Sequence, residues 1–317
     1  MYAQILTNLG IKYKTDVPVK SLTGMNQTNI LPLVAYPKSI NELKHLILSA
    51  DNFEDIDIFG GLTNTYIAQS FSKKLVIITT HICDYIIVDE NTIRVGCGYN
   101  LTKLCKELMS KGIAGYIGFI GIPGTVGGAT INNSGAFGVE MKDVVKGCHI
   151  ITSNGHIKFL TNEDLKYMPR QSSLKGKRDY VLLSIDLDIS KKGDIQNMER
   201  TLMQQKKIRA KKIDGKNKSL GSIFFAPSLK HIYNMHPFAV FFKRLLNIPN
   251  KILFDNKKFA LWLQFLLLGH PELAKHCDSF NRFCWTKDTS EQDFFYYLNT
   301  MQELGNNELR LEIEIRK

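Results

Sequence analysis

The feature that most constrains this chain is a glycine-rich stretch, GIPGTVGGATINNSGAFG, at residues 121–138. Six of its eighteen residues are glycine and none is charged. Glycine lets the backbone adopt positive φ and approach a neighbour closely, because it has no Cβ. The stretch is too short for a collagen repeat and matches neither GxGxxG nor GxxxxGK(S/T). Two interpretations stay open: tight turns with close strand packing, or an array of N–H groups that binds an anion.

A second loop follows the same logic. FGGLTNTYIAQ, at residues 59–69, comes directly after the strand-like run DIDIF and begins with Gly60 and Gly61. One such loop taken alone is explained by turn geometry. Two glycine loops that each follow a strand favour a shared ligand bearing a diphosphate, which backbone N–H groups can cradle.

Hydrophobic periodicity predicts a mixture of helices and strands over residues 1–190. One helix, at 39–50, opens with a capping box formed by Ser39 and Glu42, and a second, at 100–112, has Asn100 as its N-cap and Gly112 just beyond its end. Strands are predicted at 55–59, 74–80 and 179–189, and hairpins at 84–98 and 144–160, the latter turning at Asn154–Gly155. Hairpins favour an α+β fold with mixed or antiparallel sheets over a regular βαβ repeat.

The character of the chain changes near residue 195. A basic helix at 197–212 leads to a turn-rich stretch, then to aromatic helical material at 236–304 and a C-terminal strand at 307–316. We therefore predict one domain over 1–195, made of two parts that divide near residue 80. A second, α+β domain is predicted over 196–317.

The net charge indicates the kind of partner the protein binds, and the cysteine spacing argues against a disulfide framework or a zinc site. The net charge of +11 suits a polyanionic partner, and QQKKIRAKKIDGKNK at 204–218 is either a solvated helix face or an anion-binding rim. We see no nucleic-acid-binding motif. The six cysteines have no disulfide-framework or zinc spacing, and the N-terminus has no signal-peptide pattern. We expect a cytoplasmic protein with reduced thiols, no metal and no membrane span, because the apolar run at 259–269 is too short.

The glycine-rich stretch and the residues that follow it resemble a sequence signature of a known family. GIPGTVGGATINNSGAFGVEMKD resembles the flavin-binding signature of UDP-N-acetylenolpyruvoylglucosamine reductases, in which an N-x-GA-(Y/F)-G-x-E segment follows a run like GIPGTVGGA. FGGLTN similarly resembles the family's GGGSN loop, with Leu62 and Thr63 in place of Gly and Ser. YMPRQSS at 167–173, SLGSIFFAP at 219–227 and LEIEIR at 311–316 resemble three further elements of the family, in the same order.

The resemblance implies a fold and a cofactor. It implies a two-part FAD-binding domain like those of the vanillyl-alcohol oxidase class, with FAD held non-covalently and NADPH as co-substrate. Related oxidases that tether flavin covalently are disfavoured, because residues 59–69 contain no histidine or cysteine. The implied cofactor contacts are Gly60, Gly61, Leu62, Thr63, Asn64, Gly121, Ile122, Pro123, Gly124, Thr125, Gly127, Gly128, Ala129, Asn133, Gly135 and Ala136.

The resemblance also implies a reaction and its residues. The family reduces an enolpyruvyl ether of a UDP-sugar to a lactyl ether, a step in peptidoglycan synthesis. Ser222 is implied as the proton donor, Arg170 and Glu314 as groups that stabilise the enolic intermediate, and Lys212 as a substrate contact. The C-terminal strand would then return to the active site. Without the resemblance, Ser222 reads as a turn residue and Arg170 and Glu314 as surface charges.

Several elements depart from the family pattern. Phe225 and Ala226 stand where relatives have a polar residue and asparagine, and LTGMNQTNI at 22–30 is a degraded form of an N-terminal element. The region 225–285 diverges throughout. Three alternatives therefore stay open: a flavin oxidoreductase of the same fold with another substrate, a catalytically silent FAD-binding protein, and a nucleic-acid module. We expect a monomer.

Overall fold

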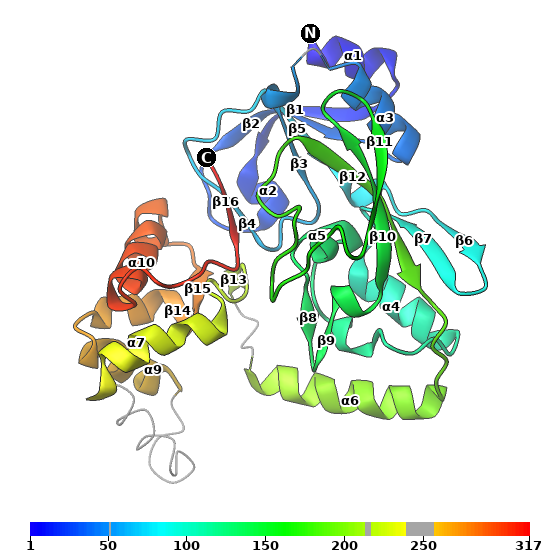
Figure 1. Cartoon of the computed structure of the whole chain (residues 1–317). Coiled ribbons are helices and arrows are strands. Elements are labelled where there is room, and N and C mark those ends of the chain that lie inside the picture. Colours follow the sequence, from blue (N-terminus) through cyan, green and yellow to red (C-terminus); the bar gives the residue numbers. More distant parts are fainter. Residues whose placement is uncertain (51, 213–216, 239–256) are drawn as a thin grey trace. The chain divides into compact units, whose positions relative to one another are not determined.

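The computed structural model describes residues 1–50, 52–212, 217–238 and 257–317. Contacts divide the chain into two compact units, neither of which is continuous in sequence (Figure 1). This division differs from the single boundary predicted near 195, because the basic helix α6 (Ile195–Lys212) packs with the first unit. Unit 1 comprises residues 1–17, 30–62 and 72–212, and unit 2 comprises residues 18–29, 63–71 and 213–317.

Unit 1 is built on two sheets. The first has the strand order β1-β2-β5-β3, and β5 pairs in parallel with both β2 and β3. The second has the order β11-β10-β12-β7-β6 and is antiparallel. The combination confirms the predicted α+β class with mixed and antiparallel sheets. The strands are β1 (Lys12–Pro18), β2 (Ile30–Tyr36), β3 (Ile56–Phe59), β5 (Leu75–Ile78), β6 (Tyr85–Asp89), β7 (Thr92–Gly96), β10 (Val145–Thr152), β11 (Ile157–Thr161) and β12 (Tyr180–Asp188).

Local signals in the sequence set the ends of several elements of unit 1. Ser39 caps α3 (Ile40–Leu48), its Oγ accepting a hydrogen bond from Glu42 N at 3.1 Å. Asn100 caps α4 (Leu101–Ser110) in the same way. Gly155 has φ +82° in the turn between β10 and β11. These predicted helices and hairpins are confirmed, and each one rests on contacts between near neighbours in sequence.

Helices and a small hairpin complete unit 1 around one hydrophobic core. The core runs from Tyr2 to Leu202 and includes Ile77 of the first sheet and Ile185 of the second. In Figure 1, α6 lies alongside the hairpin β8–β9. The remaining elements are α1 (Tyr2–Asn8), α5 (Val126–Ile131), β8 (Gly135–Ala136), β9 (Val139–Glu140) and the 3₁₀ turns Phe53–Asp55, Thr79–His81, Ile117–Phe119 and Met141–Asp143.

Unit 2 has a separate aromatic core. Phe283, Phe294 and Tyr297 are fully buried there and pack ring against ring. Its sheets are β13-β15-β14, antiparallel, and the parallel pair β16-β4. The elements are α2 (Val19–Thr23), β4 (Thr65–Ile67), β13 (Lys218–Ser219), α7 (Lys230–Met235), α9 (Lys257–Leu267), β14 (Cys277–Ser279), β15 (Arg282–Trp285), α10 (Glu291–Leu304), β16 (Glu314–Arg316) and the 3₁₀ turns Ala226–Leu229 and Pro271–His276.

Two predictions for the second half of the chain need correction. The strand expected over 307–316 shrinks to β16, because its partner β4 has only three residues and Asn306 and Asn307 adopt positive φ. The region expected to be helical, 236–304, includes the strands β14 and β15, and its residues 239–256 lie outside the described part of the chain. None of the helices in the described ranges has the length and apolar character that a membrane crossing requires.

Candidate active site

The two glycine loops meet within unit 1. A Cβ added to Gly60, directly after β3, would lie 2.4 Å from Thr125 Oγ1. Thr125 is only 4% exposed and its Oγ1 accepts a hydrogen bond from Gly128 N, so its side chain cannot swing aside without losing that bond. Only glycine fits at position 60. The close approach of Gly60 to Thr125 supports the prediction that both loops serve one site.

The glycines of the stretch 121–138 fall into two kinds. Gly121 and Gly124 have φ of +92° and +109°, a region that side chains disfavour. Gly127 and Gly135 are required by packing, because a Cβ would lie 2.8 Å from Cys97 O and 2.2 Å from Val139 O respectively. Turn geometry and close packing, the first interpretation offered by the sequence, therefore account for these four glycines.

Backbone donors in these loops fit an anionic cofactor. The amides of Ile122, Gly127 and Ala129 donate to carbonyl oxygens of the protein itself. The amides of Gly61 and Gly124 have no acceptor within the described ranges of the chain. Unpaired N–H groups in two adjoining glycine loops suit the diphosphate of FAD, since backbone amides otherwise need a partner. Gly128 adds open space, because a Cβ there would meet only Thr125 Oγ1, at 3.4 Å.

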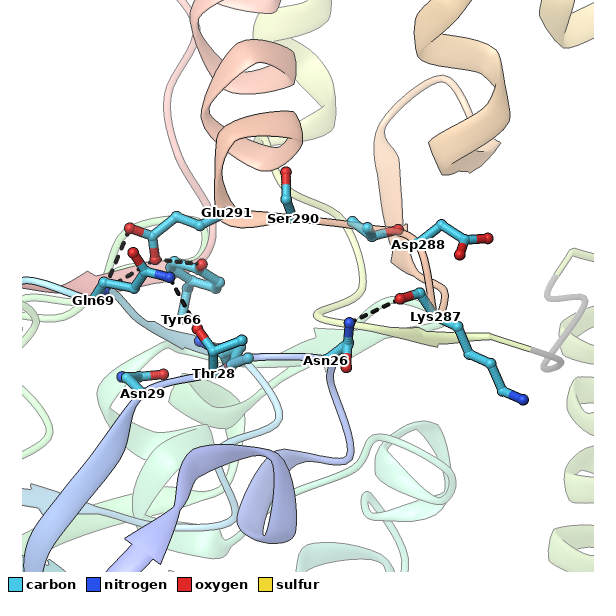
Figure 2. Close-up of a pocket in the computed structure, with 11 residues that line it drawn as sticks. Asn26, Thr28, Asn29, Tyr66, Gln69, Lys287, Asp288, Ser290 and Glu291 are labelled. Atoms are coloured by element: carbon cyan, nitrogen blue, oxygen red, sulfur yellow. Dashed lines mark hydrogen bonds between the residues drawn. The ribbon is translucent and has the colours of Figure 1, made fainter.

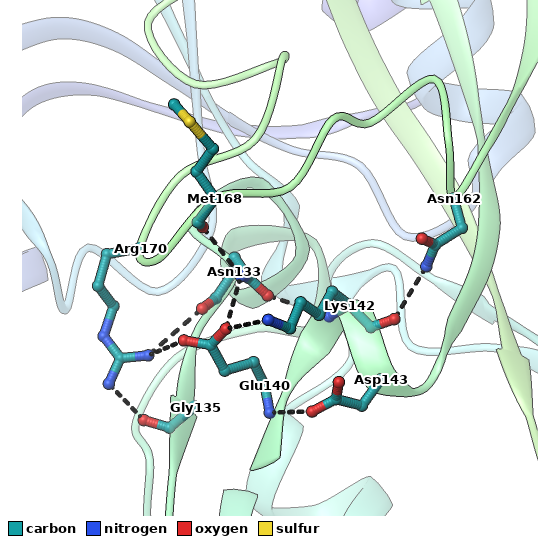
Figure 3. Close-up of polar contacts among 8 residues, drawn as sticks. All are labelled: Asn133, Gly135, Glu140, Lys142, Asp143, Asn162, Met168 and Arg170. Carbon is teal, nitrogen blue, oxygen red and sulfur yellow. Dashed lines mark hydrogen bonds and ion pairs between the residues drawn. The ribbon is translucent and has the colours of Figure 1, made fainter. Parts of the chain in front are cut away.

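Asn133 organises the segment that follows the loop (Figure 3). Asn133 is fully buried, and its backbone has φ +42°. Its Nδ2 donates to Glu140 Oε2 at 3.1 Å and to Met168 O at 3.0 Å. Its Oδ1 accepts from Lys142 N at 3.0 Å. The side chain of this predicted cofactor contact therefore bonds to the protein and fixes the hairpin β8–β9.

Arg170 is tied to the same segment. Its Nη2 donates to Gly135 O at 2.7 Å, and its Nη1 lies 3.4 Å from both Asn133 O and Glu140 Oε1 (Figure 3). Arg170 has φ +58°, which is uncommon for a residue with a side chain and costs conformational energy. Such strain collects at functional sites, because the surrounding structure must enforce it. Glu140 was not predicted as a site residue, and its place in the N-x-GA-F-G-x-E segment was the available signal.

Ser222 and Glu314 lie on adjacent segments of unit 2. Phe224 bridges to Leu311 and Glu312 N donates to Ile223 O at 2.8 Å, so the chain around Ser222 runs antiparallel to the C-terminal segment. Glu314 starts β16, pairs with Thr65 and forms an ion pair with Arg316 at 2.8 Å. Asn64, in the glycine loop at residues 59–69, donates from Nδ2 to Glu312 O. The structure thus brings two of the three predicted catalytic residues together.

The remaining predicted site residues divide between the units. Arg170 belongs to unit 1, whereas Ser222 and Glu314 belong to unit 2. The glycine loop at residues 59–69 is itself divided, with Leu62 in unit 1 and Thr63 in unit 2. The other cofactor contacts, Pro123 and Ala136, lie in unit 1. Lys212 is the last residue of α6, and its side chain is outside the described part of the structure.

Unit 2 also holds a polar pocket that the sequence did not predict (Figure 2). Its volume is about 270 Å³, and the segments 26–29 and 287–291 form much of its wall. Tyr66 donates its hydroxyl to Glu291 Oε2 at 2.7 Å, and burial together with that carboxylate raises the pKa of Tyr66. None of the predicted site residues lines this pocket.

Comparison with known proteins agrees with the geometry. Residues 31–161 match the family model described as an FAD binding domain. The UDP-N-acetylenolpyruvoylglucosamine reductase of Alkaliphilus oremlandii is 32% identical over 213 residues, which cover 67% of this chain and 69% of that protein. This chain belongs to the UDP-N-acetylenolpyruvoylglucosamine reductase family. The reductase of Bacillus subtilis is 27% identical over 225 residues, covering 71% of this chain and 74% of the relative.

A solved structure shows that the whole fold is shared with this reductase family. The UDP-N-acetylenolpyruvylglucosamine reductase of Thermus caldophilus matches with a TM-score of 0.66, and the match covers 97% of this chain and 99% of that one. Sequence identity over the match is 18%, so the likeness carries the fold alone. The fold therefore extends through unit 2, where the sequence departs most from the family pattern.

Proposed function

We propose that this protein is an FAD-dependent reductase that uses NADPH to convert UDP-N-acetylglucosamine enolpyruvate to UDP-N-acetylmuramate. The observation that carries the proposal is the junction of two glycine loops, Gly60 against Thr125, in a chain of the reductase family. The relatives are named for this reduction, and Arg170, Ser222 and Glu314 occupy the positions that the family resemblance assigns to catalysis.

The reaction adds one hydride and one proton across the enolpyruvyl double bond. The two glycine loops would hold FAD, which would supply the hydride for the terminal carbon after reduction by NADPH. Arg170 stabilises the negative charge that develops on the substrate carboxylate, because its guanidinium is held in place by Gly135 O and Glu140. Ser222 donates the proton to the carbon that bears the ether oxygen, and Glu314 orients the intermediate. Lys212 contributes positive charge towards the substrate diphosphate.

We also propose the setting in which the protein works. All six cysteines are free thiols, which fits the reducing conditions of a cytoplasm. The substrate is a UDP-sugar, and the working form is a monomer. Light scattering of the purified holoprotein measures that state, and a mass of about 36.1 kDa is expected for one chain.

Two half-reactions under anaerobic conditions test the proposed function. The purified protein should be yellow, and NADPH should bleach the flavin absorbance. UDP-N-acetylglucosamine enolpyruvate should then restore the absorbance, whereas UDP-N-acetylglucosamine, which lacks the enolpyruvyl group, should not. Bleaching without reoxidation by the enolpyruvyl sugar would reject this function and favour a flavin oxidoreductase with another substrate. A colourless protein that takes up no FAD would reject both.

A further inference from the structure

A single arginine of α6 approaches the glycine-rich stretch and the residue Gly118 before it at three points. Arg209 Nη2 donates to Gly118 O at 2.9 Å, and its guanidinium carbon lies 5.2 Å from the centre of the Phe137 ring. A Cβ on Gly121 would lie 2.3 Å from Arg209 Nη1. Gly118 precedes the stretch, Gly121 begins it and Phe137 is its penultimate residue. One side chain therefore spans the stretch from end to end.

This arginine is partly buried without a carboxylate partner. No ion pair joins Arg209 to an acidic side chain among the residues that the structure describes, and burial lowers the pKa of its guanidinium. Taking a cation out of water is costly unless other groups compensate. Here the carbonyl oxygen of Gly118, just before the glycine-rich stretch, and the face of the Phe137 ring within it compensate. These contacts offset the free-energy cost of removing the Arg209 guanidinium from water.

The contacts need the planar fork of arginine. The guanidinium donates from one nitrogen to Gly118 O, places another against Gly121 and faces the Phe137 ring at the same time. A lysine ammonium is a compact point charge and cannot reproduce the three contacts together. Two of the three residues that Arg209 approaches have positive φ, +55° at Phe137 and +92° at Gly121. Such backbone conformations persist only when neighbouring groups stabilise them.

We infer that Arg209 is a positioning residue for FAD: it locks the glycine-rich stretch in the shape that admits the cofactor. This inference rests on the proposed function only through FAD, and not through the sugar substrate. Gly121 then has a second reason to be glycine besides its positive φ, because a side chain there would displace the guanidinium. The helix α6 contributes to the site through this inward-facing cation as well as through its exposed basic face.

The test compares Arg209→Lys and Arg209→Ala with Lys207→Ala, which removes one positive charge from an exposed position of the same helix. FAD is stripped from each protein and rebound, and its dissociation constant is measured by quenching of flavin fluorescence. We expect both Arg209 variants to bind FAD about 10-fold more weakly, since each loses a charge-assisted hydrogen bond and a cation–π contact. Lys207→Ala should stay within about twofold of the wild type.

Visible circular dichroism of the bound flavin gives a second readout, because it reports the shape of the cradle around the isoalloxazine and the diphosphate. The Arg209→Lys spectrum should differ from that of the wild type at full FAD occupancy. Wild-type affinity and an unchanged spectrum in Arg209→Lys would overturn the inference, because charge alone would then suffice. If Arg209→Ala does not fold, Arg209→Lys still decides. A wild type that binds no FAD would instead contradict the proposed function.

Discussion

The glycine-rich region of unit 1, residues 118–143, and the paired segments 219–227 and 309–316 of unit 2 hold their functional residues in opposite ways. In unit 1, Asn133, Arg170 and Arg209 all bond to the backbone of the region, which fixes its shape. In unit 2, Ser222 is exposed and its hydroxyl has no partner among the described residues. A cofactor cradle needs a fixed backbone, whereas a proton donor needs surroundings that the bound substrate completes.

This contrast explains why the sequence signature is strong in one region and weak in the other. A backbone with this many close approaches requires many glycines, and substitutions there are penalised by geometry. The segments of unit 2 present few side chains to a substrate, so positions around them can change. Phe225 shows this: its ring lies under the Arg310 guanidinium at 3.9 Å, a contact that fills the place of a family polar residue.

The largest expected effect tests the rigidity of the unit 1 region. Gly135→Ala places a Cβ 2.2 Å from Val139 O, and a backbone atom cannot move aside without opening the hairpin β8–β9. We expect the free energy of unfolding to fall by about 3 kcal/mol. Urea denaturation monitored by far-ultraviolet circular dichroism measures it.

Gly128→Ala is the matched control for that variant. It lies in α5, where a Cβ meets only Thr125 Oγ1 at 3.4 Å, and alanine favours a helix by about 0.5–1 kcal/mol. Its apoprotein should unfold no earlier than the wild type while binding FAD more weakly, if Gly128 faces the cofactor. Equal stability of the two alanine variants would show that packing does not fix the region.

A smaller effect is expected from the carboxylate that holds Arg170. Glu140→Gln keeps the shape of the side chain but removes the negative charge that lies 3.4 Å from Arg170 and 3.2 Å from Lys142. We expect a loss of about 1–2 kcal/mol in the free energy of unfolding, since the neutral amide cannot form ion pairs with Arg170 and Lys142. The exposed Glu163→Gln serves as control and should be neutral. A neutral Glu140→Gln would mean that Arg170 is held by its carbonyl contacts alone.

The smallest effect concerns acid stability in unit 2. Burial lowers the pKa of His276, which is 6% exposed and lies 3.3 Å from Asp293 Oδ1. The unfolded chain therefore binds a proton that the folded chain resists. The stability contribution is complete above about pH 6.5 and is lost as the pH falls from there towards the lowered pKa.

A His276→Gln variant should accordingly lose less stability on acidification from pH 7 to pH 5, by about 0.5–1 kcal/mol. Thermal unfolding across that interval, with wild type and variant side by side, measures the difference. Parallel curves for the two proteins would remove His276 as a source of acid sensitivity.

The sequence predicted those parts of the fold that depend on near neighbours. Helix caps and a tight turn were predicted correctly, at Ser39, Asn100 and Asn154–Gly155. Each depends on interactions between residues only a few positions apart in sequence. It did not predict that residues 18–29 and 63–71 join unit 2, because that depends on packing between distant segments. The short length of β16 was missed for the same reason: its partner β4 lies far away in sequence.

The candidate site shows the same limit. The family signature located the glycine loops and Arg170, but the contacts that hold them come from elsewhere in the chain. Arg209 lies 91 residues from Gly118, and in the sequence it is one of several cations in a basic helix. The run of basic residues did not indicate that Arg209 is partly buried, since the neighbouring Lys206 and Lys207 are exposed.

We propose that the glycine loops hold the cofactor and that Ser222 of unit 2 acts only on the substrate. Stopped-flow absorbance of Ser222→Ala tests this directly, by timing the reduction of FAD by NADPH and then its reoxidation by UDP-N-acetylglucosamine enolpyruvate. Reduction should proceed at the wild-type rate, and reoxidation should slow by about 100-fold or more, the usual contribution of a positioned acid. An equal slowing of both half-reactions, or reoxidation at the wild-type rate, would contradict the account.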